Sequence, residues 1–199
     1  MHEPRLKFGL GLGYAVSPTG ADHVHNIHDT MFATEDGLPK TKPYGILTPL
    51  LPQDLDNSKV RMFYYLMHHE LLKNVLGVCV FLPYLPNTIV EIVRGVSGWD
   101  TSLLELFQVA ERGMAMARAF NAREGFTAAD DKLPSRYFEA FDSGPLEGVS
   151  QNPDQFKSAL DFFYHMAGWD SESGAPTPYK LAELGLDWVS EMLYEQKSG

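Results

Sequence analysis

The clearest helical pattern in the chain lies at residues 102–125, SLLELFQVAERGMAMARAFNAREG. Ser102 and Glu105 have the spacing of a capping box, in which each side chain satisfies a free backbone N–H at the start of a helix. The apolar residues that follow recur at helical spacing and form one stripe, made of Leu103, Leu106, Phe107, Ala110, Met114, Ala117 and Phe120. The pattern predicts an amphipathic helix that begins after Ser102, ends near Gly125 and buries one face.

Similar signals on both sides predict further helices. Cap residues at 56–58 precede an apolar helical period that runs to Val75, with Gly77 at its end. Pro86 opens a second helix that ends at Gly95 or Gly98. Toward the C-terminus, helices are predicted at 134–141, 152–167, from 177 onward and at 186–194. No clear alternation of the kind that strands need is present. The predicted fold class is mainly α, multihelical, with a helical domain at 57–199.

Residues 1–56 carry no helical period. Glycine and proline alternate along them, and both residues interrupt regular structure. A long irregular segment in a compact domain usually serves a function or covers a partner. Gly9, Gly11 and Gly13 stand close together, but a dinucleotide-binding fingerprint needs a preceding strand and another spacing. We therefore expect an irregular segment, with close packing or flexibility at these glycines, that forms one domain with residues 57–199.

Composition excludes several classes of function. The chain has 199 residues and a formal net charge of −10, and its C-terminal third is the most acidic part, which repels nucleic-acid phosphates. The longest apolar run, 75–83, is too short to span a bilayer. Cys79 is the only cysteine, which excludes an intrachain disulfide and suits a reducing compartment. We expect a cytoplasmic protein that binds neither nucleic acid nor membrane.

Three histidines, His23, His25 and His28, lie within six residues beside Asp22 and Asp29. Imidazoles ligate zinc and similar metals, and they also move protons near neutral pH. The pattern leaves three interpretations open: a metal site, another role at a site, and loop histidines with ordinary hydrogen bonds. The first of them would make the chain a metal-dependent hydrolase.

The remaining candidates are weaker. Cys79 lies in an apolar run, where a cysteine is usually a small buried hydrophobic residue. One thiolate cannot hold a cubane iron–sulfur cluster, because four protein ligands are needed. His68-His69-Glu70 is similar to a zinc-protease helix, but Lys73 stands where that helix has its second histidine. Asp130-Asp131 fits helix capping better than acid–base catalysis. On these residues alone, a non-catalytic helical interaction module is a second alternative.

One long motif is Asn121-Ala-Arg-Glu-Gly-Phe-Thr127 followed by Asp130-Asp131-Lys-Leu-Pro134-Ser-Arg136. It resembles a run found in one enzyme family, the tungsten-containing aldehyde ferredoxin oxidoreductases. Further segments of this chain resemble other motifs of the family and follow in the same order. They are Gly13-Tyr-Ala-Val-Ser17 with Gly20-Ala-Asp-His23, Leu76-Gly77-Val78-Cys79-Val80-Phe81, Ser97-Gly-Trp99-Asp100, and Gly168-Trp169-Asp170 with Gly174, Pro176 and Leu184-Gly185-Leu186. The resemblance covers almost the whole chain.

The resemblance implies a fold and an activity. Members of the family have a β-rich N-terminal domain that holds a tungsten bis-pterin, covered by two helical domains. They oxidise aldehydes to carboxylates with water and pass electrons through a nearby 4Fe-4S cluster to ferredoxin. The β domain, the other cluster cysteines and the glutamate of the middle domain have no counterpart here. We therefore expect the C-terminal third of such an enzyme, inactive alone, whose N-terminal and middle domains come from the same enzyme or from a partner subunit. Tungsten and molybdenum are both compatible with it.

The resemblance also assigns roles to individual residues. Cys79 is expected to be the fourth ligand of the iron–sulfur cluster, and His23 the proton donor or acceptor near the metal. Asn74 stands where the family has an aspartate that binds pterin, and Thr19 and His25 stand where it has basic residues. Val80, next to the cysteine, completes the expected cofactor-binding residues. In this view residues 1–56 face the cofactor.

Overall fold

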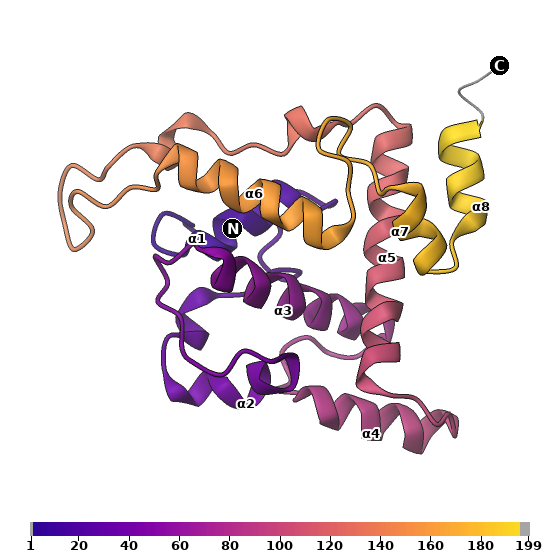
Figure 1. Cartoon of the computed structure of the whole chain (residues 1–199). Helices are drawn as coiled ribbons and strands as arrows, with labels where there is room; N and C mark the ends of the chain where they lie inside the picture. Colours follow the sequence, from indigo (N-terminus) through magenta and orange to yellow (C-terminus); the bar gives the residue numbers. More distant parts are fainter. Residues whose placement is uncertain (1, 196–199) are drawn as a thin grey trace.

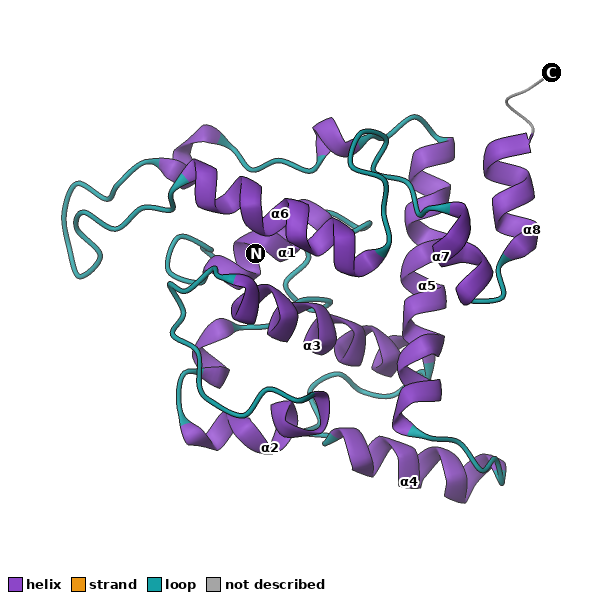
Figure 2. Cartoon of the chain, in the orientation of Figure 1, coloured by secondary structure: helices purple, strands orange, loops and turns teal. Residues whose placement is uncertain are grey.

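The computed structural model describes residues 2–195 and consists of helices joined by loops (Figure 2). The helices are α1 (Phe8–Val16), α2 (Leu38–Thr41), α3 (Asn57–Val75), α4 (Pro86–Ser97), α5 (Leu103–Arg123), α6 (Pro153–Ala167), α7 (Pro178–Glu183) and α8 (Asp187–Ser190), which a π-helical turn at Glu191–Glu195 extends. Short 3₁₀ turns lie at Asp29–Phe32, Glu35–Gly37, Lys42–Tyr44, Ala128–Asp130 and Ser135–Phe138. The mainly α prediction is confirmed.

The helices pack around α3 and α5 (Figure 1). α3 and α6 lie side by side, and α1 contacts both of them. α5 crosses the C-terminal end of α3, with α4 against its first half and α7 and α8 against its second half. The main core lies between α1, α3 and α6, where Leu12, Phe63 and Phe163 are fully buried. No helix in the described range is long and apolar enough to cross a membrane.

Local signals place most helix ends where the sequence predicts them. Asp56, Ser102, Asn152 and Thr177 each accept a hydrogen bond from a backbone N–H in the first turn of their helix. Such a cap contributes about 1 kcal/mol. The capping box at Ser102 is only half formed, because the side chain of Glu105 accepts from the hydroxyl of Thr101, at 2.8 Å.

The prediction of irregular structure is wrong for residues 8–16, which form the buried helix α1. Glycine inside a helix costs about 1 kcal/mol relative to alanine. Here the missing Cβ makes room for neighbours: a Cβ would lie 2.6 Å from Asp29 at Gly9, 2.2 Å from Tyr137 at Gly11, and 2.3 Å from Asn26 at Gly13. Of the two roles expected for these glycines, close packing is therefore the one observed.

Asp29 caps α1 from a distant part of the chain. Its carboxylate accepts from the backbone N–H groups of Gly9, at 3.0 Å, and Leu10, at 2.9 Å. Lys59 of α3 donates to the same carboxylate at 2.9 Å, and both side chains are completely buried. One ion pair thus joins α1, α3 and the loop that carries the histidines.

A second buried ion pair lies in the segment after α5. Asp131 accepts from both arms of the Arg118 guanidinium, at 2.8 and 2.6 Å, and from the hydroxyl of Tyr164. Arg118 also donates to the carbonyl of Gly174 at 2.7 Å. The capping interpretation is correct for Asp130, which accepts from the backbone N–H of Thr127, but wrong for Asp131.

Two buried histidines of α3 are expected to make stability depend on pH. His68 donates from Nδ1 to the carbonyl of Tyr64, and His69 donates from Nε2 to the carbonyl of Tyr84. Burial lowers the pKa of each to about 4. The unfolded chain, with histidine pKa values near 6.5, therefore binds more protons between these limits. The free energy of unfolding should fall as pH drops from about 6.5 to about 4, by on the order of 3 kcal/mol per histidine.

Urea unfolding at a series of pH values measures this loss. His69→Gln keeps a donor for Tyr84 but cannot take up a proton, so its stability should fall less steeply over the same range. If the free energy of unfolding of this variant fell as steeply with pH as that of the wild type, His69 would not be one of the groups that cause the loss of stability.

Candidate functional site

Cys79 lies on an exposed turn between α3 and α4. The chain leaves α3 at Gly77, whose φ of +68° favours glycine. The backbone N–H of Val78 then donates to the carbonyl of Lys73 at 3.0 Å, and that of Leu82 donates to the carbonyl of Cys79 at 3.3 Å. The interpretation of this cysteine as a buried hydrophobic residue is wrong, and its thiol is open to a partner.

A cluster of three charges lies behind this turn. Glu70 of α3 is paired with both Lys73 of the same helix and Lys40 of α2. Burial acts to raise the pKa of the Glu70 carboxyl, but the two ammonium groups outweigh it and leave the pKa below its ordinary value. Lys73 also donates from Nζ to the carbonyl of Val80 at 3.0 Å. The carboxylate therefore stays charged and holds the two lysines in place.

The loop that carries His23, His25 and His28 is here named the histidine loop. A cavity of about 260 Å³, named the His23 cavity, lies between this loop and the segment after Cys79. His23 and His28 line it from the loop, and Val80 and Phe81 line it from the other side. The charged cluster of Lys40, Glu70 and Lys73 also contributes to its wall. The structure thus brings His23 and Val80, predicted from separate motifs, to one cavity.

The imidazole of His23 belongs to a group of three histidine rings. Its ring centroid lies 4.7 Å from that of His2 and 6.0 Å from that of His28, while His2 and His28 are 4.6 Å apart. Lys7 donates to Nδ1 of His28 at 3.1 Å, so that nitrogen carries no proton. Burial, with help from Lys7, lowers the pKa of His28 and keeps its ring neutral. Sequence reasoning missed His2, because no spacing or motif connects it to the later histidines.

His25 lies apart from this group. It contacts Asp22, with 3.6 Å between the nearest nitrogen and oxygen, and shares a different cavity, of about 140 Å³, with Thr19. Met67 of α3 and Gly113 of α5 close that cavity. Across residues 2–195, no group of three or more His, Cys, Asp or Glu side chains could hold a metal ion. The arrangement that a hydrolase based on His23, His25 and His28 needs is therefore not formed.

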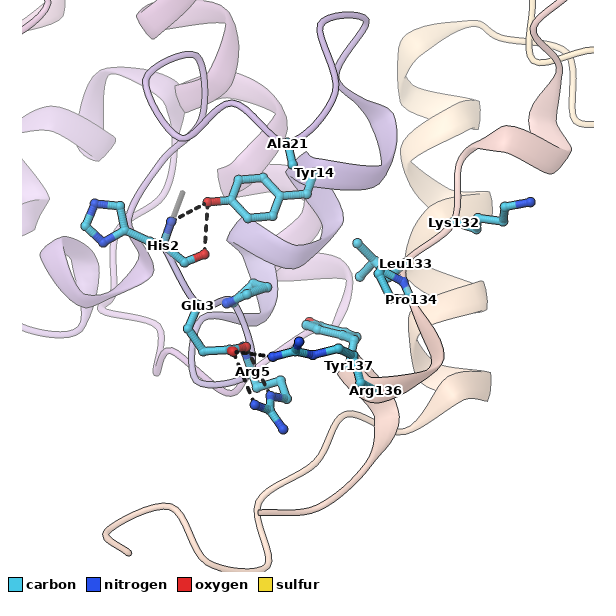
Figure 3. A pocket seen from close by; sticks show the side chains of 11 residues that line it. His2, Glu3, Arg5, Tyr14, Ala21, Lys132, Leu133, Pro134, Arg136 and Tyr137 are labelled. Atoms are coloured by element: carbon cyan, nitrogen blue, oxygen red, sulfur yellow. Dashed lines mark hydrogen bonds and ion pairs between the residues drawn. The ribbon is translucent and has the colours of Figure 1, made fainter. Parts of the chain in front are cut away.

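A larger cavity, of about 470 Å³, has His2 in its wall (Figure 3). It is lined by the N-terminal segment and by residues 132–137. Two sets of polar contacts lie at this cavity: the hydroxyl of Tyr14 bonds the backbone of His2, and Glu3 accepts from Arg5 at 3.1 and 3.2 Å (Figure 3). Some of its residues belong to the motifs quoted above, but none was predicted as a site residue.

The surface around Cys79 is largely apolar and exposed. Large apolar side chains surround the turn and are open to solvent, with exposed fractions of 48% for Val75, 88% for Phe81, 49% for Leu82 and 42% for Leu85. Asn74, in the last turn of α3, is exposed as well. A thiol is a suitable iron ligand, and Cys79 is the single cysteine of this sequence, so a four-ligand iron–sulfur cluster at this position would need ligands from elsewhere.

Comparisons with known proteins place the chain in context. A family described as "Aldehyde ferredoxin oxidoreductase, domains 2 & 3" matches residues 1–186. The chain is 28% identical over 189 residues to tungsten-containing aldehyde ferredoxin oxidoreductases of Pyrococcus furiosus and Thermococcus kodakarensis, and each alignment covers 93% of this chain and 29% of the relative. The chain thus spans less than a third of these relatives.

Two further similarities extend the comparison. A shorter match, 37% identical over 57 residues, covers 29% of this chain and 9% of the aliphatic sulfonate oxidoreductase WOR-like subunit of Pyrococcus furiosus. Among solved structures, the active site complex BamBC of benzoyl coenzyme A reductase with 1,5-dienoyl-CoA aligns with a TM-score of 0.70 and 18% identity, covering 99% of this chain and 32% of that chain. At this identity the structural match shows a shared fold.

Proposed function

The chain belongs to the aldehyde ferredoxin oxidoreductase family, and from this premise we propose that it is the C-terminal part of a tungstopterin enzyme that oxidises aldehydes to carboxylates. One observation carries the proposal: His23 and Val80 line a single cavity, and the exposed Cys79 directly precedes Val80. A proton-transfer group and a potential iron ligand thus lie on neighbouring segments, as an enzyme that couples oxidation to electron transfer requires.

The proposed roles follow from the chemistry of each side chain. The thiolate of Cys79 would ligate one iron of a 4Fe-4S cluster. His23, which lines the cavity, would donate or accept a proton at a ring nitrogen, since an imidazole nitrogen can be either a donor or an acceptor. The tungsten or molybdenum bis-pterin would supply the two-electron oxidation.

Four further residues are proposed to contact the pterin. Asn74 would donate and accept hydrogen bonds at a pterin edge without adding the charge of an aspartate. Val80 would contact it from the wall of the His23 cavity. Thr19 and His25, which line the separate cavity of about 140 Å³, would contact it from there.

The exposed apolar surface around Cys79 is proposed to pack against the N-terminal and middle domains, which supply the other cluster ligands. Ferredoxin is the proposed electron acceptor. It is expected to avoid the acidic C-terminal third of this chain, because ferredoxins are commonly acidic and like charges repel. The isolated chain is proposed to be inactive.

The proposal is tested by replacing Cys79 in the complete enzyme, assembled from this chain and the remaining domains. Cys79→Ala is expected to remove most of the iron and acid-labile sulfide, because the cluster loses one of its four protein ligands. Val78→Ala, one position earlier on the same turn, keeps the thiol and should keep the cluster. Wild-type iron and sulfide in Cys79→Ala would overturn the proposal.

A further inference from the structure

Resting on this proposed function, we propose that Lys73 is a positioning residue that sets the place of the Cys79 thiolate against the iron–sulfur cluster.

The geometry shows how one lysine brackets the cysteine. The carbonyl of Lys73 accepts from the backbone N–H of Val78 at 3.0 Å, and its Nζ donates to the carbonyl of Val80 at 3.0 Å. Val78 and Val80 are the residues directly before and after Cys79. The residues on both sides of the cysteine are therefore bonded to one residue of α3, Val78 through its backbone N–H and Val80 through its carbonyl, so the backbone is tethered just before and just after Cys79.

The burial of Lys73 supports a specific role for its ammonium group. The side chain is only 3% exposed, and burying a charged lysine is costly without a paired charge and hydrogen bonds. Glu70 provides that paired charge and is itself held by Lys40. An apolar side chain of similar size would fill the same space without this cost, but it would leave the carbonyl of Val80 without its donor.

The hydrogen bond between Lys73 and the carbonyl of Val80 also lies at the wall of the His23 cavity. Val80, whose carbonyl Lys73 holds, contributes to the wall of that cavity, and Lys73 itself lines it. A shift of this carbonyl would therefore move the cysteine and the cavity wall together. Lys73 acts through the backbone of the turn, since none of its contacts is with the thiol.

Lys40 offers a matched control. Lys40 and Lys73 both pair with Glu70, but only Lys73 bonds the Cys79 turn. Lys40→Met and Lys73→Met therefore each remove one positive charge from the same carboxylate, and they differ in whether the turn keeps its tether.

The test compares these variants in the complete enzyme, with iron content, the electron paramagnetic resonance spectrum and reduction potential of the cluster, and hydrogen exchange at residues 77–82 as readouts. Lys73→Met is expected to speed amide exchange in the turn by about 10- to 100-fold, because a charge-assisted hydrogen bond is lost. Its cluster spectrum and potential should change. Lys40→Met should keep the wild-type rate of amide exchange, cluster spectrum and reduction potential. Identical behaviour of the two variants would overturn the proposal.

Lys73→Arg keeps the test decisive if Lys73→Met does not fold. Arginine preserves the charge for Glu70, but its planar guanidinium reaches the Val80 carbonyl with different geometry. It should bind iron at wild-type stoichiometry with a shifted reduction potential, whereas an unshifted potential would refute a positioning role. Cys79→Ala separates the two proposals: if that variant retains the cluster, the proposed function fails, and if it loses the cluster, the lysine variants test Lys73 alone.

Discussion

Replacing His23 by alanine in the complete enzyme is expected to lower aldehyde-dependent viologen reduction by about 10²- to 10⁴-fold, the usual contribution of a positioned acid–base group. The reason lies in the placement of the ring. His23 lines the same cavity as Val80, the residue after Cys79, and its ring centroid lies 4.7 Å from that of His2 and 6.0 Å from that of His28. Alanine removes the imidazole and leaves the turn untouched, so iron content should stay at the wild-type level.

A control for this variant is available on another helix. His165 is exposed on α6, where its Nδ1 donates to the carbonyl of Asp161 at 2.7 Å, and His165→Ala should retain full activity. Added imidazole should restore part of the lost rate in His23→Ala if the ring transfers a proton. A parallel loss of iron and activity would instead give His23 a structural role.

Replacing Lys59 by methionine is expected to destabilise the chain by about 3–5 kcal/mol, the usual cost of removing one partner of a buried ion pair. Lys59 and Asp29 are completely buried, and Asp29 also receives two backbone N–H groups of α1. Without the ammonium group, the carboxylate remains buried with no positive charge beside it. The free energy of unfolding in urea measures the loss.

Two comparisons make this prediction specific. Lys157→Met, on the exposed face of α6, removes the same charge from the surface and should change stability by less than about 0.5 kcal/mol. The double variant Lys59→Met with Asp29→Asn removes both charges, so it should be more stable than the sum of the two single losses indicates. Simple additivity would show that the pair does not act as a unit.

The helices with local signals at both ends were predictable from sequence. α3 begins after Asp56, α5 after Ser102 and α6 after Asn152, as their cap residues indicate. Such caps act within one helical turn, so the information needed to read them lies in adjacent residues. The segment at 134–141 was predicted less well, because only a 3₁₀ turn at Ser135–Phe138 forms there.

The candidate site was predictable only in part. His23, Val80 and Cys79 could be named from the resemblance. That His23 and Val80 line one cavity could not be predicted, because distant segments meet there. His2 and the cluster of Lys40, Glu70 and Lys73 had no motif to reveal them. A lysine six residues before a cysteine has meaning only once the chain has turned back at Gly77 and brought the Val80 carbonyl to its Nζ.

The sequence by itself determined the mainly α class, most helix boundaries and the identity of the motif residues, since periodicity, caps and motifs are properties of neighbours along the chain. The tertiary structure alone decided that the glycine-rich residues 8–16 are a helix, that Asp131 pairs with Arg118, and that Cys79 is exposed. The physical reason is common to all three: the deciding partners, such as Asp29 for α1, are remote in sequence, and burial exists only after the chain has folded.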